Sequence, residues 1–211
     1  MSLDESVFTW INNLGGHVDF IDYIFVGFAN DYFTIIAMCL VLVGMWFYAC
    51  NPKERSINQI TVLRAMASLV LASGAVSLFT NVIFVNGGPF DGTWLYSVFH
   101  HPRPFDVFGL QVVHKFYYPH DSSFPSNLAS IVFGLAMAVW VRNRKVGTSL
   151  LMMAVLACFA RIYVGVHFPS DILGGIAFAL FGLGLTSFLF WAFKPIVRWL
   201  QRLMRSVYIA D

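Results

Sequence analysis

Charged side chains are scarce in this sequence. Of its 211 residues, 13 are Lys or Arg and 11 are Asp or Glu, so 11% are charged while 58% are hydrophobic. A soluble domain carries about 25% charged residues, which cover its water-facing surface. The shortage excludes an ordinary soluble enzyme, and the high apolar content excludes a disordered chain. A net charge of +2, without a basic stripe interleaved with aromatic residues, indicates no nucleic-acid partner.

Cysteines are few, and the features of a cleaved leader are missing. Cys39, Cys50 and Cys158 lie in or beside apolar runs and lack CxxC or metal-ligand spacing. We interpret them as small buried hydrophobic residues. The N-terminal segment, MSLDESVFTWINN, is acidic and lacks the basic region of a signal peptide. We therefore expect the membrane-spanning segments themselves to direct the chain into a membrane.

Long apolar runs are the main feature that is present. A helix needs about 20 apolar residues to cross roughly 30 Å of hydrocarbon. The runs that come near this length are residues 32–49, 60–85, 146–163 and 172–193. Residues 127–141 form a shorter run that can extend upstream, and residues 18–30 carry two Asp residues, which favours a helix in the interface. The sequence predicts an all-α, polytopic membrane helix bundle with five or six transmembrane helices.

The positions of Lys and Arg predict the orientation, because cytoplasmic loops are enriched in these residues. Five spans place three basic clusters in the cytoplasm, and residues 86–125 then form an extracytoplasmic loop, on the same side as the turn at 165–171. Residues 1–30 form an interfacial helix or a first span. Without a repeat or linker, we expect residues 1–211 to form a single integral-membrane domain. The basic residues are Lys53, Arg55 and Arg64; Arg142, Arg144 and Lys145; and Lys194, Arg198, Arg202 and Arg205.

The densest group of polar residues at an outer span end lies in residues 160–175, ARIYVGVHFPSDILGG. Asp171 follows His167 by four residues, so its carboxylate can hold one imidazole nitrogen and leave the other free as a nucleophile. Pro169 suits the first turn of a helix, where the helix dipole also favours the Asp171 anion. Arg161 lies at the end of the preceding run. Singly, these residues suit an interfacial anchor, a loop residue and a helix cap, but together they indicate a phosphate site with a nucleophile.

Two further segments predict contacts with phosphate. In residues 120–130, HDSSFPSNLAS, Ser126 or Asn127 can cap a helix whose free N–H groups and positive dipole end suit phosphate oxygens. In residues 100–106, HHPRPFD, Arg103 lies between two prolines that stiffen its backbone, and a rigidly held Arg suits bidentate phosphate binding. Alone, each segment has an ordinary interpretation as a helix cap or a loop arginine.

In this order, the three segments resemble the motifs of the type-2 phosphatidic-acid phosphatase superfamily, KxxxxxxRP, PSGH or a variant of it, and SRxxxxxHxxxD. The sequences HPRPF and SSFPSN are most similar to those of bacterial undecaprenyl-diphosphate phosphatases of the bacitracin-resistance type. The resemblance covers about residues 100–175, and the pattern of spans extends it to most of the chain. The matching residues are Arg103-Pro104, Pro125-Ser126-Asn127, and Arg161, His167 and Asp171.

The resemblance implies a lipid phosphatase that hydrolyses a polyprenyl (undecaprenyl) diphosphate to the monophosphate, for recycling of the lipid carrier used in cell-wall synthesis. His167 would form a phosphohistidine and Asp171 would orient it. No metal or other cofactor is implied, and the partners are the lipid phosphate and membrane lipids. The implied location is the bacterial plasma membrane with an outward-facing site, and the oligomeric state is left open. The phosphoryl oxygens would be held by Arg103, Arg161, Ser126 and backbone N–H groups at Asn127.

Three positions depart from the family motifs. Tyr96 stands where the first motif has Lys, and Ala160 replaces the serine before Arg161. Leu128 stands where the family has the histidine that protonates the leaving group. Leucine can neither donate nor accept a proton, and general acid catalysis is worth about 10²- to 10⁴-fold in rate. We therefore expect the chain as written to be impaired.

Leu128 leaves several interpretations open. It is a deliberate substitution that traps an inactive enzyme, or His114 or His120 of the same loop supplies the proton, or the protein is a natural binder that has lost catalysis. A lipid phosphotransferase, another lipid-phosphate phosphatase and a non-catalytic lipid-phosphate binder remain as alternative functions. A transporter is disfavoured because the apolar centres of the spans contain almost no ionisable residues.

Overall fold

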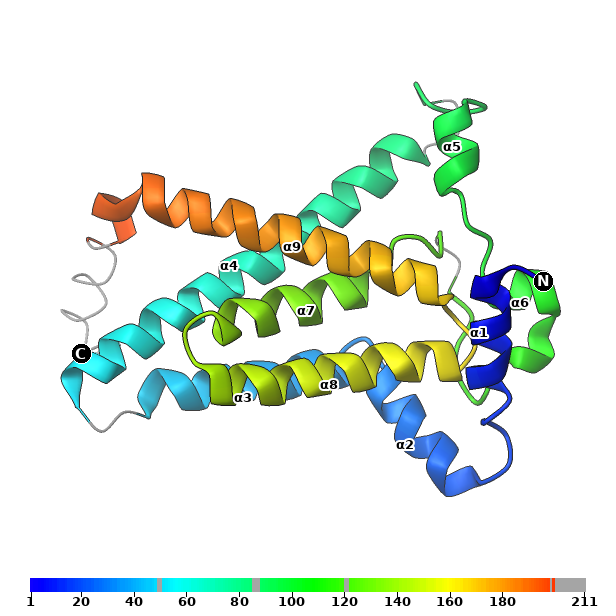
Figure 1. Cartoon of the computed structure of the whole chain (residues 1–211), viewed down its shortest axis with the longest axis horizontal. Coiled ribbons are helices and arrows are strands. Elements are labelled where there is room, and N and C mark those ends of the chain that lie inside the picture. Colours follow the sequence, from blue (N-terminus) through cyan, green and yellow to red (C-terminus); the bar gives the residue numbers. More distant parts are fainter. Residues whose placement is uncertain (49–50, 85–87, 120–121, 198, 200–211) are drawn as a thin grey trace.

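The computed structural model describes residues 1–48, 51–84, 88–119, 122–197 and 199, and over these residues the regular structure is helical throughout. Five helices run alongside one another and form the body of the bundle, and the shorter elements gather around one end of it (Figure 1). The predicted all-α membrane bundle is therefore confirmed. The body consists of α3 (Phe33–Phe47), α4 (Pro52–Ile83), α7 (Asn127–Trp140), α8 (Arg144–Tyr163) and α9 (Pro169–Ala192). The shorter elements are α1 (Leu3–Asn12), α2 (Asp19–Ala29), α5 (Trp94–Phe99), α6 (Pro104–Phe108) and the 3₁₀ turn η1 (Leu110–Val112).

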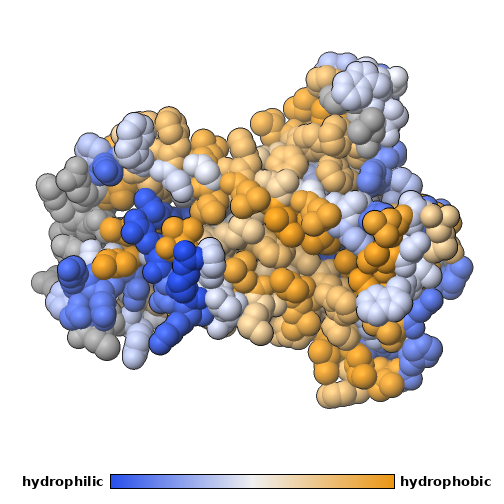
Figure 2. Space-filling view, viewed as in Figure 1, coloured by the Kyte–Doolittle hydropathy of each residue, from blue (hydrophilic) through white to orange (hydrophobic). Residues whose placement is uncertain are grey.

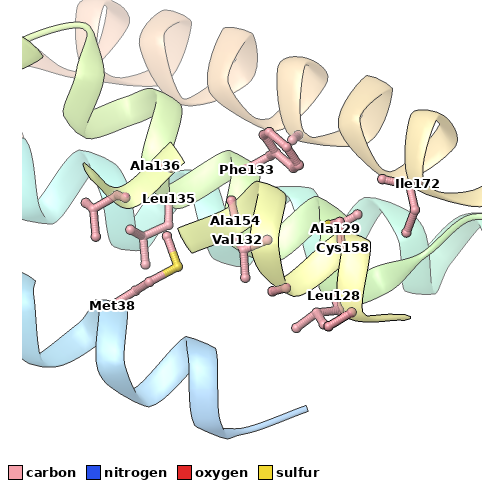
Figure 3. Packing of buried hydrophobic residues seen from close by; sticks show 14 of the residues in the cluster. Met38, Leu128, Ala129, Val132, Phe133, Leu135, Ala136, Ala154, Cys158 and Ile172 are labelled. Carbon is pink, nitrogen blue, oxygen red and sulfur yellow. The ribbon is translucent and has the colours of Figure 1, made fainter. Parts of the chain in front are cut away.

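Helix α7 lies at the centre, packed against α4, α8 and α9. Its residues are mostly small or branched and mostly buried, and they share a cluster with Met38 of α3, Cys158 of α8 and Ile172 of α9 (Figure 3). Glycines let α9 approach closely. A Cβ on Gly175 would lie 2.4 Å from the Ser126 carbonyl oxygen, and one on Gly182 would lie 2.8 Å from Ala72 of α4. Close backbone approach of this kind stabilises helix packing in membranes, where the lipid supplies no hydrophobic drive between helices.

Three described helices, α4, α8 and α9, are each long and apolar enough to cross a membrane. The 24 residues of α9, for example, extend about 36 Å at 1.5 Å per residue. Helices α2 and α3 reach this length only together and are bent by 62° at the break between them. Helix α7 is apolar but has only 14 residues. These described helices give three membrane spans, or four if the bent pair is one span. The expected number of five or six transmembrane helices therefore stays a prediction.

The lateral surface of the body is apolar. Large hydrophobic side chains are exposed along α3, α8 and α9, including Leu40, Met152, Leu173 and Phe188. They form a broad hydrophobic region over the middle of the molecule, whereas strongly hydrophilic residues are concentrated near one end (Figure 2). Exposed apolar patches of this extent are rare on soluble monomers. The surface is that of a multi-pass membrane protein.

Two predictions about helix boundaries were wrong. Lys53 and Arg55 lie within α4 instead of a loop, because the Asn51 side chain accepts from the Glu54 N–H at 2.9 Å and Lys and Arg are good helix formers. Arg64 also lies within α4, inside the predicted run 60–85. Helix α7 does not extend upstream of Asn127, because Ser126 caps it. Residues 86–125, expected as a loop, include α5, α6 and η1. The predicted span ends Ala49 and Val85, and Cys50, His120, Arg198, Arg202 and Arg205, lie outside the described residues.

The two ends of the bundle differ in charge. Arg142, in the turn between α7 and α8, and Arg144 and Lys145, at the start of α8, share one groove with Glu54 near the start of α4. The first turn of α7, the last turn of α8 and the start of α9 lie at the opposite end, beside α1 and α6 (Figure 1). Two basic clusters therefore lie together, at the end away from the motif residues.

Candidate active site

The turn between α8 and α9 places three of the predicted residues. Arg161 lies in the last turn of α8, His167 in the turn, and Asp171 is the third residue of α9. Pro169 begins α9, as the sequence predicted. The turn requires Gly165, whose φ is +84° and whose Cβ, if it had one, would lie 2.1 Å from the Val112 carbonyl oxygen. Arg161, His167 and Asp171 are all buried, at 4%, 5% and 0% exposure.

His167 is held on one edge of its ring. Its Nδ1 lies 3.4 Å from Asp171 Oδ2 and 3.4 Å from Ser123 Oγ, and the Ser123 hydroxyl donates to the same carboxylate oxygen at 2.5 Å. The Phe168 N–H also donates to Oδ2, at 2.8 Å. The other ring nitrogen, Nε2, makes no hydrogen bond to a described residue. Burial lowers the pKa of His167, which keeps the imidazole neutral at neutral pH, as a nucleophile requires.

A second imidazole lies on the opposite oxygen of Asp171. The Nδ1 atom of His101 is 3.5 Å from Oδ1, and contact with this carboxylate raises the pKa of His101. His101 rests against the ring of Phe124, with the centroids 5.3 Å apart. The buried carboxylate therefore has an imidazole on each of its oxygens, and the second of these, His101, is half-buried.

Arg161 is only partly paired. Its Nη2 donates to Asp31, which also accepts from the Tyr117 hydroxyl. The Nε and Nη1 atoms are buried and have no hydrogen-bond partner among the described residues. Burying a charged donor without a partner is costly, so an anionic oxygen at these two atoms would be stabilised by charge-assisted hydrogen bonds.

Arg103 reaches the same region from the other side. Its Nη1 donates to the Val166 carbonyl oxygen at 2.8 Å, which ties residues 100–106 to the turn that contains His167. Its backbone N–H donates to Asp106 at 3.0 Å, and α6 begins with the following Pro104. The side chain is buried at 4% exposure. The rigid presentation that the two prolines predicted is therefore matched by contacts at both ends of the residue.

These groups surround one pocket of about 480 Å³. Arg103, Asn127, Leu128, Arg161 and His167 all line it. Ser126 lies just behind the wall: its hydroxyl accepts from the Ala129 N–H at 3.5 Å, and its backbone N–H donates to the Asp171 carbonyl oxygen at 3.0 Å. The lining also includes apolar side chains from α3, α4 and α7, beside further polar residues. These apolar side chains are Ile35, Val76 and Ile131.

The structure brings the predicted residues together, but its described residues offer no substitute imidazole in the pocket. Leu128, in the first turn of α7, is 4% exposed and lines the wall. His114 points elsewhere, because its Nε2 lies 3.0 Å from the Asn12 carbonyl oxygen and its ring lies against Gly15. His120 lies outside the described residues. Within the described chain, His167 is therefore the one histidine on the pocket wall, and no cluster of three His, Cys, Asp or Glu residues could hold a metal ion.

Four residues of this arrangement were missed by the sequence analysis. Ser123 and His101 lie inside segments that were singled out, so proximity to the motifs was a usable signal. Asp31 and Tyr117 lie far from every motif, and Asp31 is separated from Arg161 by 130 positions. The one signal available for Asp31 was that a carboxylate in such an apolar sequence is rare and therefore worth attention.

Known relatives share this architecture. The chain is 30% identical to undecaprenyl-diphosphatase BcrC of Bacillus subtilis (strain 168), over 99% of this chain and 93% of the relative. It is 28% identical to putative undecaprenyl-diphosphatase YbjG of Escherichia coli (strain K12), over 86% of this chain and 79% of that protein.

Solved structures agree in fold. The crystal structure of Aquifex aeolicus LpxE superposes with a TM-score of 0.62 at 21% identity, covering 88% of this chain and 95% of that one. The crystal structure of a PAP2-type phosphatidylglycerolphosphate phosphatase from Bacillus subtilis gives 0.55 at 18% identity, covering 90% and 85%. The sequence profile of the PAP2 superfamily, the type-2 phosphatidic-acid phosphatases, matches residues 63–195, well over half of the chain. The chain therefore belongs to the PAP2 superfamily of membrane phosphatases.

Proposed function

We propose that this protein hydrolyses a polyprenyl diphosphate, of the undecaprenyl type, to the monophosphate through a phosphohistidine on His167. The observation that carries the proposal is the pocket itself, where a neutral imidazole held by a buried carboxylate faces two buried arginines. The names of the two relatives, both undecaprenyl-diphosphatases, support the same substrate class. Recycling of a lipid carrier for cell-wall synthesis is the biological role that follows.

The first chemical step is attack on the terminal phosphorus. Asp171 and Ser123 fix the Nδ1 edge of His167, so that Nε2 is the attacking atom. Arg161 offers Nε and Nη1 to the phosphoryl oxygens, and Arg103 and the first turn of α7 at Asn127 add positive charge. Stabilising the charge on these oxygens is the main requirement of phosphoryl transfer. Water then cleaves the phosphohistidine and releases phosphate.

The pocket fits a substrate that stays in the membrane. It combines the charged side chains of the motif residues with the apolar side chains of Ile35, Val76 and Ile131 from α3, α4 and α7, which suit a phosphorylated head group and the start of a lipid tail. Because basic clusters lie at the opposite end and mark the cytoplasm, we assign the pocket to the extracytoplasmic face of a bacterial plasma membrane. We further infer that residues 1–211 form one membrane domain.

Leu128 is the specific observation that favours a second candidate. A buried leucine in the position of the proton donor predicts impaired turnover, and in the limit a lipid-phosphate binder without catalysis. A lipid phosphotransferase would use the same phosphohistidine and pass the phosphate to another lipid. These alternatives differ in products, so an assay of products separates them.

The test uses the purified full chain and its Leu128→His variant in detergent micelles, with a ³²P-labelled polyprenyl diphosphate. We expect labelled inorganic phosphate, an increase with Leu128→His, and no release when His167→Ala is added to that variant. Label on a second lipid would identify a phosphotransferase. Binding without release in both forms would identify a binder, and release that survives His167→Ala would refute the nucleophile.

A further inference from the structure

The pocket has several donors for phosphoryl oxygens but a hydrocarbon side chain at position 128. Leu128 shares the wall with His167, Arg103 and Arg161 and is nearly fully buried. We infer that Leu128 makes this site selective for phosphoanhydride bonds, as in lipid diphosphates, over phosphomonoester bonds, as in lipid monophosphates. This inference rests on the proposed function and specifies its substrate class.

The two kinds of substrate differ in the group that leaves. When His167 attacks the terminal phosphorus of a diphosphate, the leaving group is a phosphate monoester, whose second pKa is about 6. It departs at neutral pH as a stable anion and needs no proton. When His167 attacks a lipid monophosphate, the leaving group is an alkoxide, whose parent alcohol is a far weaker acid, comparable with water. A proton donor is therefore nearly dispensable for the first substrate and essential for the second.

Both substrates undergo the same bond changes at phosphorus, and they differ only in the group that remains on the leaving oxygen. A bond forms between Nε2 of His167 and phosphorus, and the bond from phosphorus to the bridging oxygen breaks, leaving its electron pair on that oxygen. Water then attacks the phosphohistidine, releases inorganic phosphate with the proton of water, and restores the imidazole. Arg103 and Arg161 bind the transferred phosphoryl group, which both substrates share, so they contribute little to the choice between them.

Other titratable groups on the described wall are poorly suited to replace the missing imidazole. The Tyr117 hydroxyl donates to Asp31, and burial raises the pKa of Tyr117, so it holds its proton more tightly than an ordinary tyrosine. Asp31 accepts from both Tyr117 and Arg161, which is the behaviour of an ionised carboxylate. Tyr32 is 73% exposed at the rim. The arrangement therefore favours substrates whose leaving group needs no donor.

The experiment compares kcat/KM for farnesyl diphosphate and farnesyl monophosphate, which share one tail. The full chain is assayed in detergent micelles beside its Leu128→His and Leu128→Gln variants. Because kcat/KM reports steps through the first phosphoryl transfer, the later hydrolysis of phosphohistidine, common to both substrates, does not enter it. The Gln variant is the matched control, since it introduces a polar side chain of similar size that cannot deliver a proton at neutral pH.

We expect the parent chain to favour the diphosphate by about 10³-fold or more. Leu128→His should raise kcat/KM for the monophosphate by about 10²- to 10⁴-fold and for the diphosphate by less than about tenfold. Leu128→Gln should keep the parental ratio. A parental ratio near one, or equal gains for both substrates in Leu128→His, would overturn the selectivity while leaving the phosphatase function intact.

Two further outcomes are decisive. A Tyr117→Phe variant that loses about 100-fold in kcat/KM for the diphosphate, with no such loss when Leu128→His is also present, would identify Tyr117 as a proton donor and overturn the inference. Absence of phosphate release from either substrate in all Leu128 forms would instead refute the proposed function, on which the selectivity depends.

Discussion

Ser123 provides the sharpest test of how the nucleophile is positioned, because its hydroxyl contacts both His167 and Asp171. We predict that Ser123→Ala lowers kcat/KM by about ten- to 100-fold. The hydroxyl donates to the buried Asp171 carboxylate at 2.5 Å, and a hydrogen bond to a charged group is worth about 1.5–3 kcal/mol. At about 1.4 kcal/mol per tenfold in rate, that is roughly one to two orders of magnitude if most of the loss falls on the transition state.

The physical reason is orientation of the imidazole. Without Ser123, the Asp171 oxygen that faces His167 loses one of its donors and keeps the Phe168 N–H and the imidazole itself, and the ring loses a contact at Nδ1. Both changes let the ring rotate away from the in-line position. Ser123→Ala should therefore lower kcat more than it raises KM, because the arginines that bind phosphate are untouched.

The assay is phosphate release from a lipid diphosphate by the otherwise unchanged chain, since this substrate needs no proton donor at position 128. Ser122→Ala is the matched control, since the neighbouring hydroxyl donates to the Phe124 carbonyl oxygen at 3.2 Å and makes no hydrogen bond to Asp171 or His167. Equal unfolding midpoints for the two variants would exclude misfolding. If Ser123→Ala lost less than about threefold, or no more than Ser122→Ala, the positioning role would be refuted.

Three further predictions concern charge. Asp31→Asn should lower KM for a lipid diphosphate by about two- to fivefold in steady-state kinetics, because it frees Arg161 from its ion pair and a partly exposed pair is worth roughly 0.2–1 kcal/mol. A higher KM would mean that Asp31 chiefly positions Arg161. Since burial lowers the pKa of His167, its neutral form persists below pH 6.5, so kcat/KM should not fall until the pH drops under that value; a decline beginning near pH 7 would contradict the neutral nucleophile. The pKa of His101 is raised, so its stabilising contact with Asp171 is fully present below about pH 6.5 and is lost as the pH rises through the raised value. The difference in unfolding midpoint between the parent chain and His101→Gln should therefore be largest at about pH 6 and shrink at alkaline pH. A difference independent of pH would show that His101 acts only by packing.

The local features of the site followed from the sequence because short-range physics decides them. Ser126 caps α7 and Pro169 opens α9 with Asp171 in its first turn, as capping and dipole preferences predict. The i, i+4 spacing of His167 and Asp171 places their side chains together across that turn. The boundary errors at Lys53 and Arg55 and at the start of α7 arose because charged residues were interpreted as a loop and apolar residues as part of a helix. Helix propensity and capping prevailed over both.

By itself, the sequence determined the membrane class, the helical fold class and the motif residues that gather at the candidate pocket, because composition and motif spacing are local properties. The tertiary structure alone decided which distant groups complete that pocket. It paired Arg161 with Asp31 and Tyr117, set His101 and Ser123 on the Asp171 carboxylate, and turned His114 away toward Asn12. Such contacts join residues up to 130 positions apart, and only the packing of α2, α8 and the segments before α7 brings them within hydrogen-bonding distance.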